Sequence, residues 1–466
     1  MLTSTPAGDE SDTAAGLAGD SFSSIDFSTG ALVAVSGGGD STALLLLLKD
    51  YLDRNAPDAP LLAATVDHAL RPESAAEAQA VARLCARYGI PHRTLLWRGD
   101  KPATGLPTAA REARYRLLAE AATAAGIGLI VTAHTADDQA ETVLMRQARG
   151  ATRTTGGERG LAGMAPATLY EWKTWIVRPL LGLRRTALRA FLRDRRVGWI
   201  EDPTNIDEDY ERPRIRAALH QGRDPDRLAH LLAKARVAAV EREELSRRAT
   251  QVLGAFADAP ALGLVRLDPA FAKAGRKAAV TMLRLLLATV GGTPFPPDEA
   301  RVTMLVERLS LEKNSRATLS RTVIDSRRAG IFLYRERRGL PAAADVYDNM
   351  VWDGRHRINF RDGVDSLVIE PAGNRGVAAP LSPGNAVPAS LVAAARAAEP
   401  AFRKKAGDPA IPAEDMPQIA VVPVVSPFAR FLPCFDLGLA EALASLIGAP
   451  PLPALPFRHA KSASDA

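Results

Sequence analysis

The stretch "VAVSGGGDSTALLLLL", from Val33 to Leu48, joins a short apolar strand to a leucine-rich helix through three consecutive glycines. A glycine run costs backbone entropy, so a chain tolerates it where other atoms must approach the backbone closely. A strand, a glycine turn and a helix in succession point backbone N–H groups and a helix N-terminus at an anion, which is usually phosphate. The stretch therefore predicts a phosphate-binding loop at the end of a buried strand.

The side chains of this loop extend the prediction to a cation. The lysine of the G-x-x-x-x-G-K-[ST] loop is absent, which excludes that motif. An ordinary tight turn is the alternative, but the flanking serines and the acid at the helix start favour phosphate. A carboxylate beside a triphosphate is repulsive unless a cation lies between them, so we expect Asp40 to hold Mg²⁺. The residues expected at the phosphates and their cation are Ser36, Gly37, Gly38, Gly39, Asp40 and Ser41.

Length and composition set the class of protein. The chain has 466 residues, enough for about three domains, and its 47% hydrophobic and 24% charged residues are typical of a globular protein. We expect no membrane span, secretory signal or transit peptide, because long apolar runs and a basic start are lacking. Two isolated cysteines, Cys85 and Cys434, favour a reducing cytoplasm over a disulfide framework. The net charge of +6 permits a polyanionic partner.

Strand and helix patterns alternate between Gly30 and Arg216. The expected strands are Ala31–Val35, Leu61–Val66, His92–Trp97, Gly128–Thr132 and Trp175–Arg178. The expected helices are Thr42–Asp53, Ala75–Tyr88, Thr108–Ala125, Asp138–Arg149 and Arg185–Arg196. Short apolar strands separated by amphipathic helices predict an α/β fold, with a doubly wound parallel sheet covered on both faces. Ligands of such sheets bind beyond the carboxyl ends of the strands.

Changes in the strand and helix patterns along the chain predict further domains. We expect a disordered leader over residues 1–28, the α/β domain over 29–217, a helical domain over 218–312, a mixed α/β C-terminal domain over 313–436, and a tail over 437–466 that is disordered at its end. The predicted helices of the second domain are Asp226–Ala255, Ala278–Val290 and Pro297–Leu309. A turn near Gly330 is expected in the third.

Two polar motifs follow other predicted strands. "ATVDHALR" places Asp67 and His68 at a strand end, where an ordinary turn and a functional site are about equally good interpretations. "TAHTADDQAET" places His134 and Asp137 at the next such junction, followed by Asp138 and Glu141. The helix dipole alone favours acids in a first turn by about 0.3–1 kcal/mol each, which explains Asp138 better than it explains His134. Together with the glycine loop, these strand ends would form a single site for nucleotide, metal and acid–base chemistry.

Arginines recur at helical spacing in two places. Arg111 and Arg114 lie about one turn apart in "AAREARYRLL", where a solvated face is the ordinary interpretation and neutralisation of a transition-state charge is the functional one. A second set has almost no lysine, which favours phosphate or RNA over a solvated face because the guanidinium fork pairs with phosphate at two points. Its residues are Arg185, Arg189, Arg193 and Arg196, then Arg212, Arg214 and Arg216 after "EDPTN".

The ordered motifs "SGGGDST", "VDHALR", "AHTADDQAET", "GLAGM", "RPLL" and "EDPTN", followed by "YERPRIR", resemble those of the tRNA(Ile)-lysidine synthases, which belong to the PP-loop ATP pyrophosphatases. The resemblance covers roughly Gly30–Leu219 and implies a fold like that of the adenine nucleotide alpha hydrolases. It also implies ATP and Mg²⁺ as cofactors, and free lysine and an isoleucine tRNA with a CAU anticodon as partners. ATP would adenylate C2–O of the wobble cytidine with release of pyrophosphate, and the amino group of lysine would then displace AMP.

The resemblance also implies roles for particular residues. Asp67 and His68 would lie near the nucleotide, and His134 and Asp137 would face the cytidine and lysine. The two arginines of "AAREARYRLL", Arg111 and Arg114, would lie near the developing charge. The residues expected to bind RNA are Arg185, Arg189, Arg193, Arg212 and Arg214. The resemblance further implies a homodimer, while the sequence leaves open how this tRNA is told from the methionine tRNA that shares CAU.

Three positions depart from the family pattern. Thr135 stands where a second histidine is common, Pro213 where asparagine is usual, and Ala69 where glycine is common. Two alternatives stay open at this point. Another PP-loop tRNA-modifying enzyme, such as a thiolase, would normally need paired cysteines, which Cys85 and Cys434 do not supply. A tRNA-binding protein with an inactive site is opposed by the catalytic residues that are present.

Overall fold

The computed structural model describes residues 7–151, 160–201, 211–221, 226–312, 314–360, 367–373, 387–404, 411–413, 416 and 418–458. The chain divides into two compact units. The first comprises Met1–Glu241, Pro433–Phe435 and Pro453–Ala466, and the second comprises Arg242–Leu432 and Asp436–Leu452. None of the helices within these described ranges has both the length and the apolar character needed to cross a bilayer.

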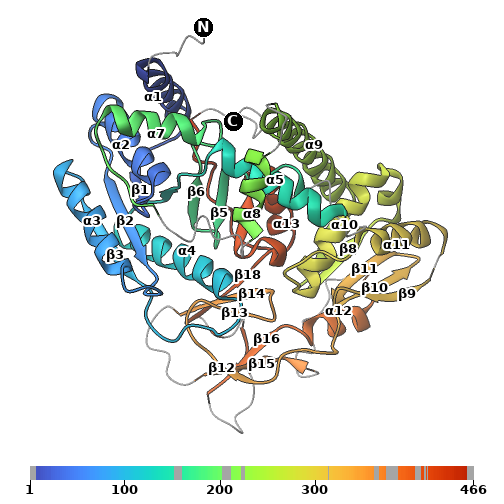
Figure 1. Ribbon diagram of the computed structural model, residues 1–466. Coiled ribbons are helices and arrows are strands. Elements are labelled where there is room, and N and C mark those ends of the chain that lie inside the picture. Colours follow the sequence, from blue (N-terminus) through green and yellow to red (C-terminus); the bar gives the residue numbers. More distant parts are fainter. Residues whose placement is uncertain are drawn as a thin grey trace. The chain divides into compact units, whose positions relative to one another are not determined.

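The first unit is built on a mostly parallel sheet (Figure 1). Its strands are β1 (Ala31–Ala34), β2 (Leu61–Asp67), β3 (His92–Leu96), β4 (Leu129–Val131), β5 (Ala167–Tyr170) and β6 (Thr174–Val177). They lie in the order β5-β6-β4-β1-β2-β3, and every neighbouring pair is parallel except β5 with β6. The predicted doubly wound α/β fold is confirmed, with one strand, β5, added in the antiparallel sense.

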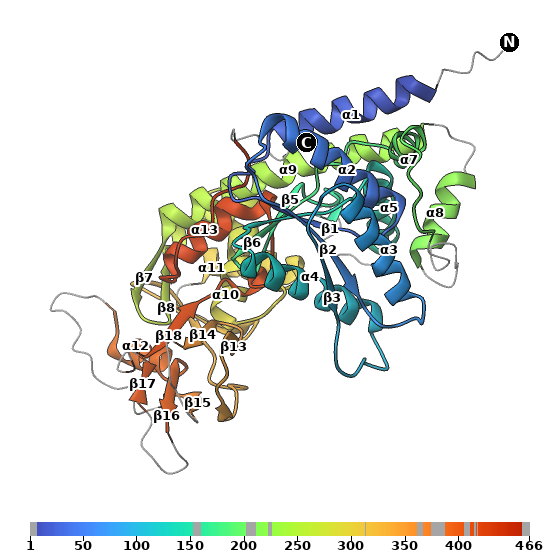
Figure 2. The same ribbon diagram turned by 90° about the vertical axis from the view of Figure 1, so that its left-hand side faces the viewer.

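Helices cover both faces of this sheet. They are α2 (Gly39–Asn55), α3 (Ser74–Arg87), α4 (Leu106–Ala124), α5 (Ala136–Ala151), α7 (Arg185–Asp194) and α8 (Glu211–Gln221). Helix α3 packs against β2 and β3, while α4 packs against β1, β2, β4 and β6. Figure 2 shows α3 and α4 on opposite sides of β2. The leucines of α2 explain its central place, because Leu44, Leu45 and Leu48 are each fully buried.

A helix lies over residues 7–23, where the sequence predicted a disordered leader. Helix α1 (Ala7–Ser23) packs against α7 and α2. It is held by a narrow stripe of Ala14, Ala18 and Phe22, which recur every four residues and are all buried. Alanines interrupted by acids give a weak hydrophobic signal, so the expectation of disorder for residues 7–23 is wrong.

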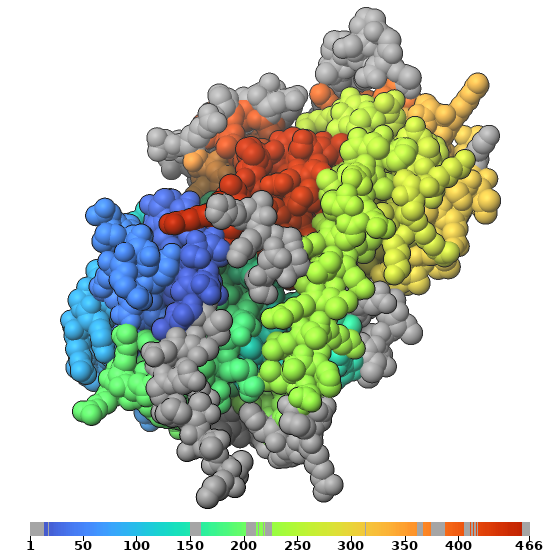
Figure 3. Space-filling view, turned by 90° about the horizontal axis from the view of Figure 1, so that it is seen from above, coloured from blue at the N-terminus to red at the C-terminus, as the bar shows by residue number. Residues whose placement is uncertain are grey.

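Residues near the C-terminus also belong to the first unit. Ile25 and Phe457 form an antiparallel bridge, in which Asp26 N donates to Pro456 O and Arg458 N donates to Ser24 O. Figure 3 shows the red C-terminal segment beside blue N-terminal residues. The end of the predicted disordered tail, 459–466, lies outside the described residues.

The second unit combines helices with three antiparallel sheets. Its helices are α10 (Arg276–Gly291), α11 (Glu299–Leu311), α12 (Ala389–Arg396) and α13 (Leu437–Leu446), and α9 (Arg227–Phe256) begins in the first unit. One sheet orders β7 (Ala257–Ala261), β8 (Leu264–Leu267), β11 (Gly330–Arg335), β10 (Thr322–Arg327) and β9 (Arg316–Leu319). The predicted turn near Gly330 joins β10 to β11.

Two smaller sheets complete this unit. One contains β12 (Ala344–Asp345), β15 (Val368–Pro371), β16 (Pro400–Arg403) and β17 (Ile411–Pro412), and the other contains β13 (Met350–Trp352), β14 (His356–Phe360) and β18 (Ile419–Pro423). A further strand is β19 (Phe431–Pro433). Because β8 pairs with β11, one sheet joins residues from both sides of the boundary predicted at 312. The division into a helical and a mixed domain stays a prediction.

Candidate active site

The predicted site residues come from the carboxyl ends of neighbouring strands. Strand β1 lies between β2 and β4. After β1 the chain adds β2 and β3 on one side of it, and then crosses over to add β4 on its other side. This arrangement is a topological switch point, where the loops after adjacent strands diverge and leave a crevice. The glycine loop follows β1, and the motif that contains His134 follows β4. The sheet therefore brings two of the predicted motifs to one edge.

The glycine loop is held open by its own serines. Ser41 Oγ donates to Gly38 O at 3.0 Å, and Ser36 N donates to Ser41 Oγ at 3.1 Å. Gly38 caps α2, and no side-chain hydrogen bond occupies that cap. The first N–H groups of a helix have no partner within the helix, so they stay available to an anion. The loop thus leaves the N-terminus of α2 without a side-chain cap, and its binding of phosphate stays a prediction.

Two residues after α7, Trp199 and Ile200, pack over this loop, and the sequence analysis did not identify them. Ile200 N donates to Gly37 O at 2.9 Å. A Cβ on Gly37 would lie 2.6 Å from Ile200 Cδ1, and a Cβ on Gly39 would lie 3.5 Å from Trp199 Cδ1. Glycine is thus required by close packing at Gly37, whose φ is +83°. Trp199 Nε1 is buried and has no hydrogen-bond partner among the residues described.

Helix α5 presents an acid cluster, Asp137, Asp138 and Glu141, to the same edge. Asp138 Oδ2 accepts from Thr135 N at 2.9 Å and from Thr135 Oγ1 at 2.8 Å. Asp138 N donates in return to Thr135 Oγ1 at 3.3 Å, so the pair forms a capping box. Burial would raise the pKa of Asp138, but the charges of Arg212 and Arg185 outweigh it and lower the pKa. Thr135, which departs from the family pattern, therefore has a structural role at the start of α5.

Asp137 joins α5 to α7. Its Oδ1 accepts from Arg184 Nη2 at 3.1 Å, and its Oδ2 accepts from the backbone N of Arg185 at 2.8 Å. A carboxylate at a helix N-terminus is favoured by the helix dipole. The structure thus occupies both oxygens of Asp137 with a guanidinium and a helix end, and Arg184 is a further site residue that the sequence analysis did not identify.

Arg185 lies in the acid cluster and not on the exposed surface where an RNA-binding stripe was expected. Its Nε donates to Asp40 Oδ2 at 2.9 Å, and its Nη2 donates to Asp138 Oδ1 at 3.2 Å. Helix α8 adds two more guanidinium groups to the cluster. Arg212 Nε donates to Glu141 Oε2 at 3.0 Å and Arg216 Nε to Glu141 Oε1 at 2.8 Å. Arginines that the sequence analysis grouped by helical spacing therefore differ in their contacts.

Asp40 has one oxygen available to a cation. Its Oδ2 pairs with Arg185, whereas its Oδ1 is buried without a hydrogen-bond partner in the described ranges. Burial raises the pKa of Asp40 more than the nearby guanidinium lowers it. Among the described residues no group of three or more His, Cys, Asp or Glu could hold a metal. A magnesium ion here would depend on one or two carboxylates together with substrate phosphates, which is its usual mode of binding.

Asp67 and His68 lie at the end of β2, on the edge shared with the glycine loop. Asp67 Oδ1 accepts from Ala69 N at 2.8 Å and closes a tight turn. Ala69 has a φ of +50°, which explains why glycine is common there in the family. Burial, followed by the charge of Arg114, lowers the pKa of His68 to about 4. Trp97 packs edge-on against the His68 ring at 5.8 Å between centroids.

His134 is uncharged at neutral pH. Burial, followed by the charge of Arg178, lowers its pKa to about 3, and Arg111 acts in the same direction. His134 Nδ1 lies 3.0 Å from Thr132 Oγ1, which fixes the ring. The Arg111 guanidinium lies 5.0 Å from the Tyr115 ring centroid, in cation–π contact. Arg111 thus acts electrostatically on His134, and Arg114 acts on His68, while the catalytic roles expected for these residues stay predictions.

The remaining predicted RNA-binding residues have different surroundings. Arg193 is exposed in the last turn of α7. Arg189 is half-buried, and its Nε has no hydrogen-bond partner among the described residues. The Cζ atom of Arg189 lies 6.0 Å from the centroid of the Trp199 ring. Arg212 and Arg214 lie in the first turns of α8 and are exposed, although Arg212 also pairs with the acid cluster. Pro213 lies third in α8, where its missing N–H costs no intrahelical bond. The motif residues Asp202 and Asn205 lie outside the described residues.

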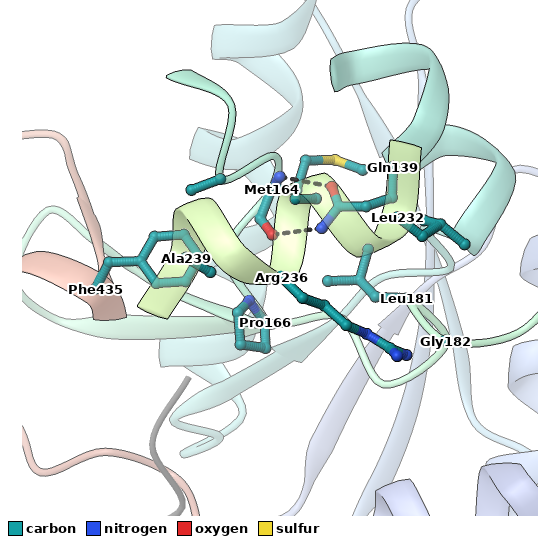
Figure 4. A pocket seen from close by; sticks show the side chains of 11 residues that line it. Gln139, Met164, Pro166, Leu181, Gly182, Leu232, Arg236, Ala239 and Phe435 are labelled. Atoms are coloured by element: carbon teal, nitrogen blue, oxygen red, sulfur yellow. Dashed lines mark hydrogen bonds between the residues drawn. The ribbon is translucent and has the colours of Figure 1, made fainter. Parts of the chain in front are cut away.

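A small hollow beside α5 explains the "GLAGM" motif (Figure 4). Gln139 Nε2 donates to Met164 O at 3.0 Å, and Met164 N donates to Gln139 Oε1 at 2.6 Å. A Cβ on Gly163, whose φ is +66°, would lie 2.5 Å from Gln139 Oε1. The Gln139 amide is thus used to anchor this loop. Leu181, Leu232, Phe435 and the longer side chain of Arg236 are among the other lining residues.

Comparison with known proteins extends this picture over the whole chain. A family model described as a PP-loop domain matches residues 20–222. A tRNA(Ile)-lysidine synthase from Mesorhizobium japonicum is 58% identical over 438 residues, 94% of this chain and 96% of that protein. One from Rhizobium meliloti is 38% identical over 440 residues, covering 91% and 93% of the two chains. A solved U34-tRNA thiolase from Methanococcus maripaludis is 15% identical, with a TM-score of 0.41 over 49% of this chain and 78% of that one.

Proposed function

Because the chain belongs to the tRNA(Ile)-lysidine synthase family, we propose that it joins lysine to C2 of the wobble cytidine in isoleucine tRNA with a CAU anticodon. In the first step the cytidine C2 oxygen attacks the α-phosphorus of ATP, and pyrophosphate leaves. In the second step the amino group of lysine attacks C2, and AMP leaves with the former C2 oxygen. Adenylation converts a poor leaving oxygen into a phosphate ester that departs readily.

One observation carries this proposal. The glycine loop after β1 and the acid cluster after β4 meet at the switch point of the sheet, and Arg185 contacts both through Asp40 and Asp138. A loop with an open helix cap can bind phosphates, and carboxylates beside it can bind cations. This combination suits a reaction that expels pyrophosphate, since the loop stabilises the leaving group and needs no lysine for γ-phosphoryl transfer.

We assign the residues of the loop to the binding of pyrophosphate. The backbone of Gly37, Gly38 and Gly39 would approach the phosphates, and Ser36 and Ser41 keep the loop in shape through their mutual hydrogen bonds. The unpartnered Asp40 Oδ1 would hold Mg²⁺, which when bound neutralises charge on the triphosphate. Asp67 orders the turn that presents His68 near the nucleotide.

The residues after β4 and on α4 would serve the reacting groups. A neutral His134 offers the cytidine or the incoming amine a hydrogen-bond partner without adding charge. Arg111 and Arg114 would stabilise the negative charge that develops at the α-phosphate. Asp137 acts as a positioning residue, because it holds Arg184 and the start of α7 in place.

The tRNA would contact the exposed arginines. Arg193 and Arg214 present guanidinium groups on the surface, and Arg189 lies between that surface and Trp199. Arg212 would contribute on the side that faces the acid cluster. A tRNA substrate places the protein in the cytoplasm, and the homodimer implied by the family stays a prediction.

The reaction is tested with the full chain, ATP, Mg²⁺, radiolabelled lysine and an isoleucine tRNA transcript with CAU. Label should enter the RNA, and a transcript with another wobble base should take up none. Asp40→Asn should abolish pyrophosphate release and spare tRNA affinity, whereas Asp53→Asn, on the exposed end of the same helix, should leave both unchanged. Normal adenylation by Asp40→Asn would contradict the proposed cation role. Binding of tRNA without any label in wild type would indicate a binding protein.

A further inference from the structure

Arg185 connects three helices through one guanidinium group. It is the first residue of α7, and its Nε lies 2.9 Å from Asp40 Oδ2 on α2. Its Nη2 lies 3.2 Å from Asp138 Oδ1, and its Nη1 lies 3.6 Å from Glu141 Oε1, both on α5. The Arg185 side chain is 15% exposed. A single buried cation thus stands between carboxylates that different parts of the chain supply.

The other arginines of the cluster do not replace it at Asp40. Arg212 and Arg216 approach from α8 and contact Glu141, and Arg212 also reaches Asp138. The side-chain hydrogen bond to Asp40 in the described structure comes from Arg185. Without Arg185, the carboxylates of Asp40 and Asp138 would repel each other with little solvent to screen them. The guanidinium therefore stabilises their approach.

The position of Arg185 also bears on metal binding. Mg²⁺ binds proteins through one or two carboxylates, and the Arg185 guanidinium already pairs with those of Asp40 and Asp138. The described residues offer no group of three or more ligands that would hold a metal by themselves. Asp40 Oδ1, however, is buried and unpartnered there, so it can serve a cation that arrives already coordinated by phosphates.

We propose that Arg185 is the resident counter-cation of the acid cluster and excludes divalent cations from it until a nucleotide brings one. This inference rests on the proposed function, because it requires that the neighbouring loop binds ATP. The consequence is that metal and nucleotide bind together, since the protein without nucleotide already has its carboxylates neutralised. Arg185 is then a positioning residue that sets the order of binding.

The test measures Mn²⁺ binding to the full chain by electron paramagnetic resonance, without tRNA or lysine. Wild type should bind Mn²⁺ weakly alone and tightly with α,β-methylene-ATP, which cannot release pyrophosphate. Arg185→Gln should bind Mn²⁺ at least about tenfold more tightly without nucleotide, because the competing charge is gone. Arg195→Gln, which removes an ion pair with Asp50 at the other end of α7, should behave as wild type.

A double variant locates the new site. Arg185→Gln combined with Asp40→Asn should lose the gained Mn²⁺ affinity, and far-ultraviolet circular dichroism should show all variants folded. The proposal is overturned if Arg185→Gln gains no affinity, or if wild type binds Mn²⁺ equally well without nucleotide. Because the measurement uses neither tRNA nor lysine, a failure here is distinct from a failure of lysidine formation. Tight Mn²⁺–nucleotide binding without labelled RNA would overturn only the proposed function.

Discussion

Replacement of Gly37 by alanine tests whether the loop geometry is as tight as it looks. The φ of Gly37 is +83°, a conformation that costs an L-residue about 1–2 kcal/mol. The added Cβ would lie 2.6 Å from Ile200 Cδ1 and 3.1 Å from Val81 Cγ2. Ile200 cannot move away freely because its N donates to Gly37 O at 2.9 Å. We therefore expect a loss of about 2 kcal/mol, which lowers Tm by about 4–8 °C in a unit of this size.

Gly38→Ala is the matched control for this experiment. Gly38 has a φ of −68°, and its added Cβ would meet Ser36 Oγ at 3.5 Å, an ordinary contact. We expect its Tm to change by no more than about 2–4 °C, in either direction. Differential scanning calorimetry with and without Mg²⁺ and ATP identifies the transition of the first unit, since a ligand raises the Tm of the unit that binds it. Equal Tm values for the two variants would refute the argument from φ and packing.

Three further predictions concern the same unit. Ala69→Gly should raise the Tm of the first unit by about 2–4 °C because Ala69 has a φ of +50°, and an unchanged Tm would contradict the strain. The pKa of His134 is lowered to about 3 in the folded protein, so between pH 6.5 and 3 only the unfolded chain protonates this imidazole. The free energy of unfolding therefore falls as pH drops below about 6.5, by up to about 1.4 kcal/mol per pH unit. The difference between the urea midpoints at pH 7.0 and 5.5 should therefore be smaller for His134→Gln than for wild type. An equal difference in the two proteins would contradict the lowered pKa of His134. Arg193→Ala should reduce the salt dependence of tRNA binding by about 0.7–0.9 in log–log slope, and an unchanged slope would make Arg193 a solvated residue.

The first half of the fold could be predicted because its signals are local. Apolar strands such as Ala31–Ala34 and the glycine run at Gly37 are visible in any short window. Strand β5 was missed because it is short and is followed by a tight turn at Glu171 and Trp172. Both residues have positive φ, which their residue types do not predict. Helix α1 was missed because alanine contributes little apolar surface, so its burial depends on a neighbour that the local pattern does not reveal.

The site was predicted in its location more than in its contacts. Strand-end motifs predicted Asp40, His134 and Asp137 as site residues, because parallel strands bring their carboxyl ends together. Helical spacing, by contrast, grouped Arg185 with Arg193, although Arg185 contacts acids on α2 and α5 and Arg193 is exposed in the last turn of α7. The packing of Trp199 on Gly39 had no signal at all, since it joins residues far apart in sequence. Contacts between residues that are far apart in the chain cannot be predicted from local patterns in a single sequence.

The bridge between Ile25 and Phe457 has a consequence for synthesis of the chain. Residues Arg242–Leu432 of the second unit are translated before Phe457. At about 5–20 residues per second, the backbone of Ile25 waits roughly 20–90 s for its partner. The unit that is translated first is thus completed last, and its N-terminal edge is open to chaperones throughout elongation.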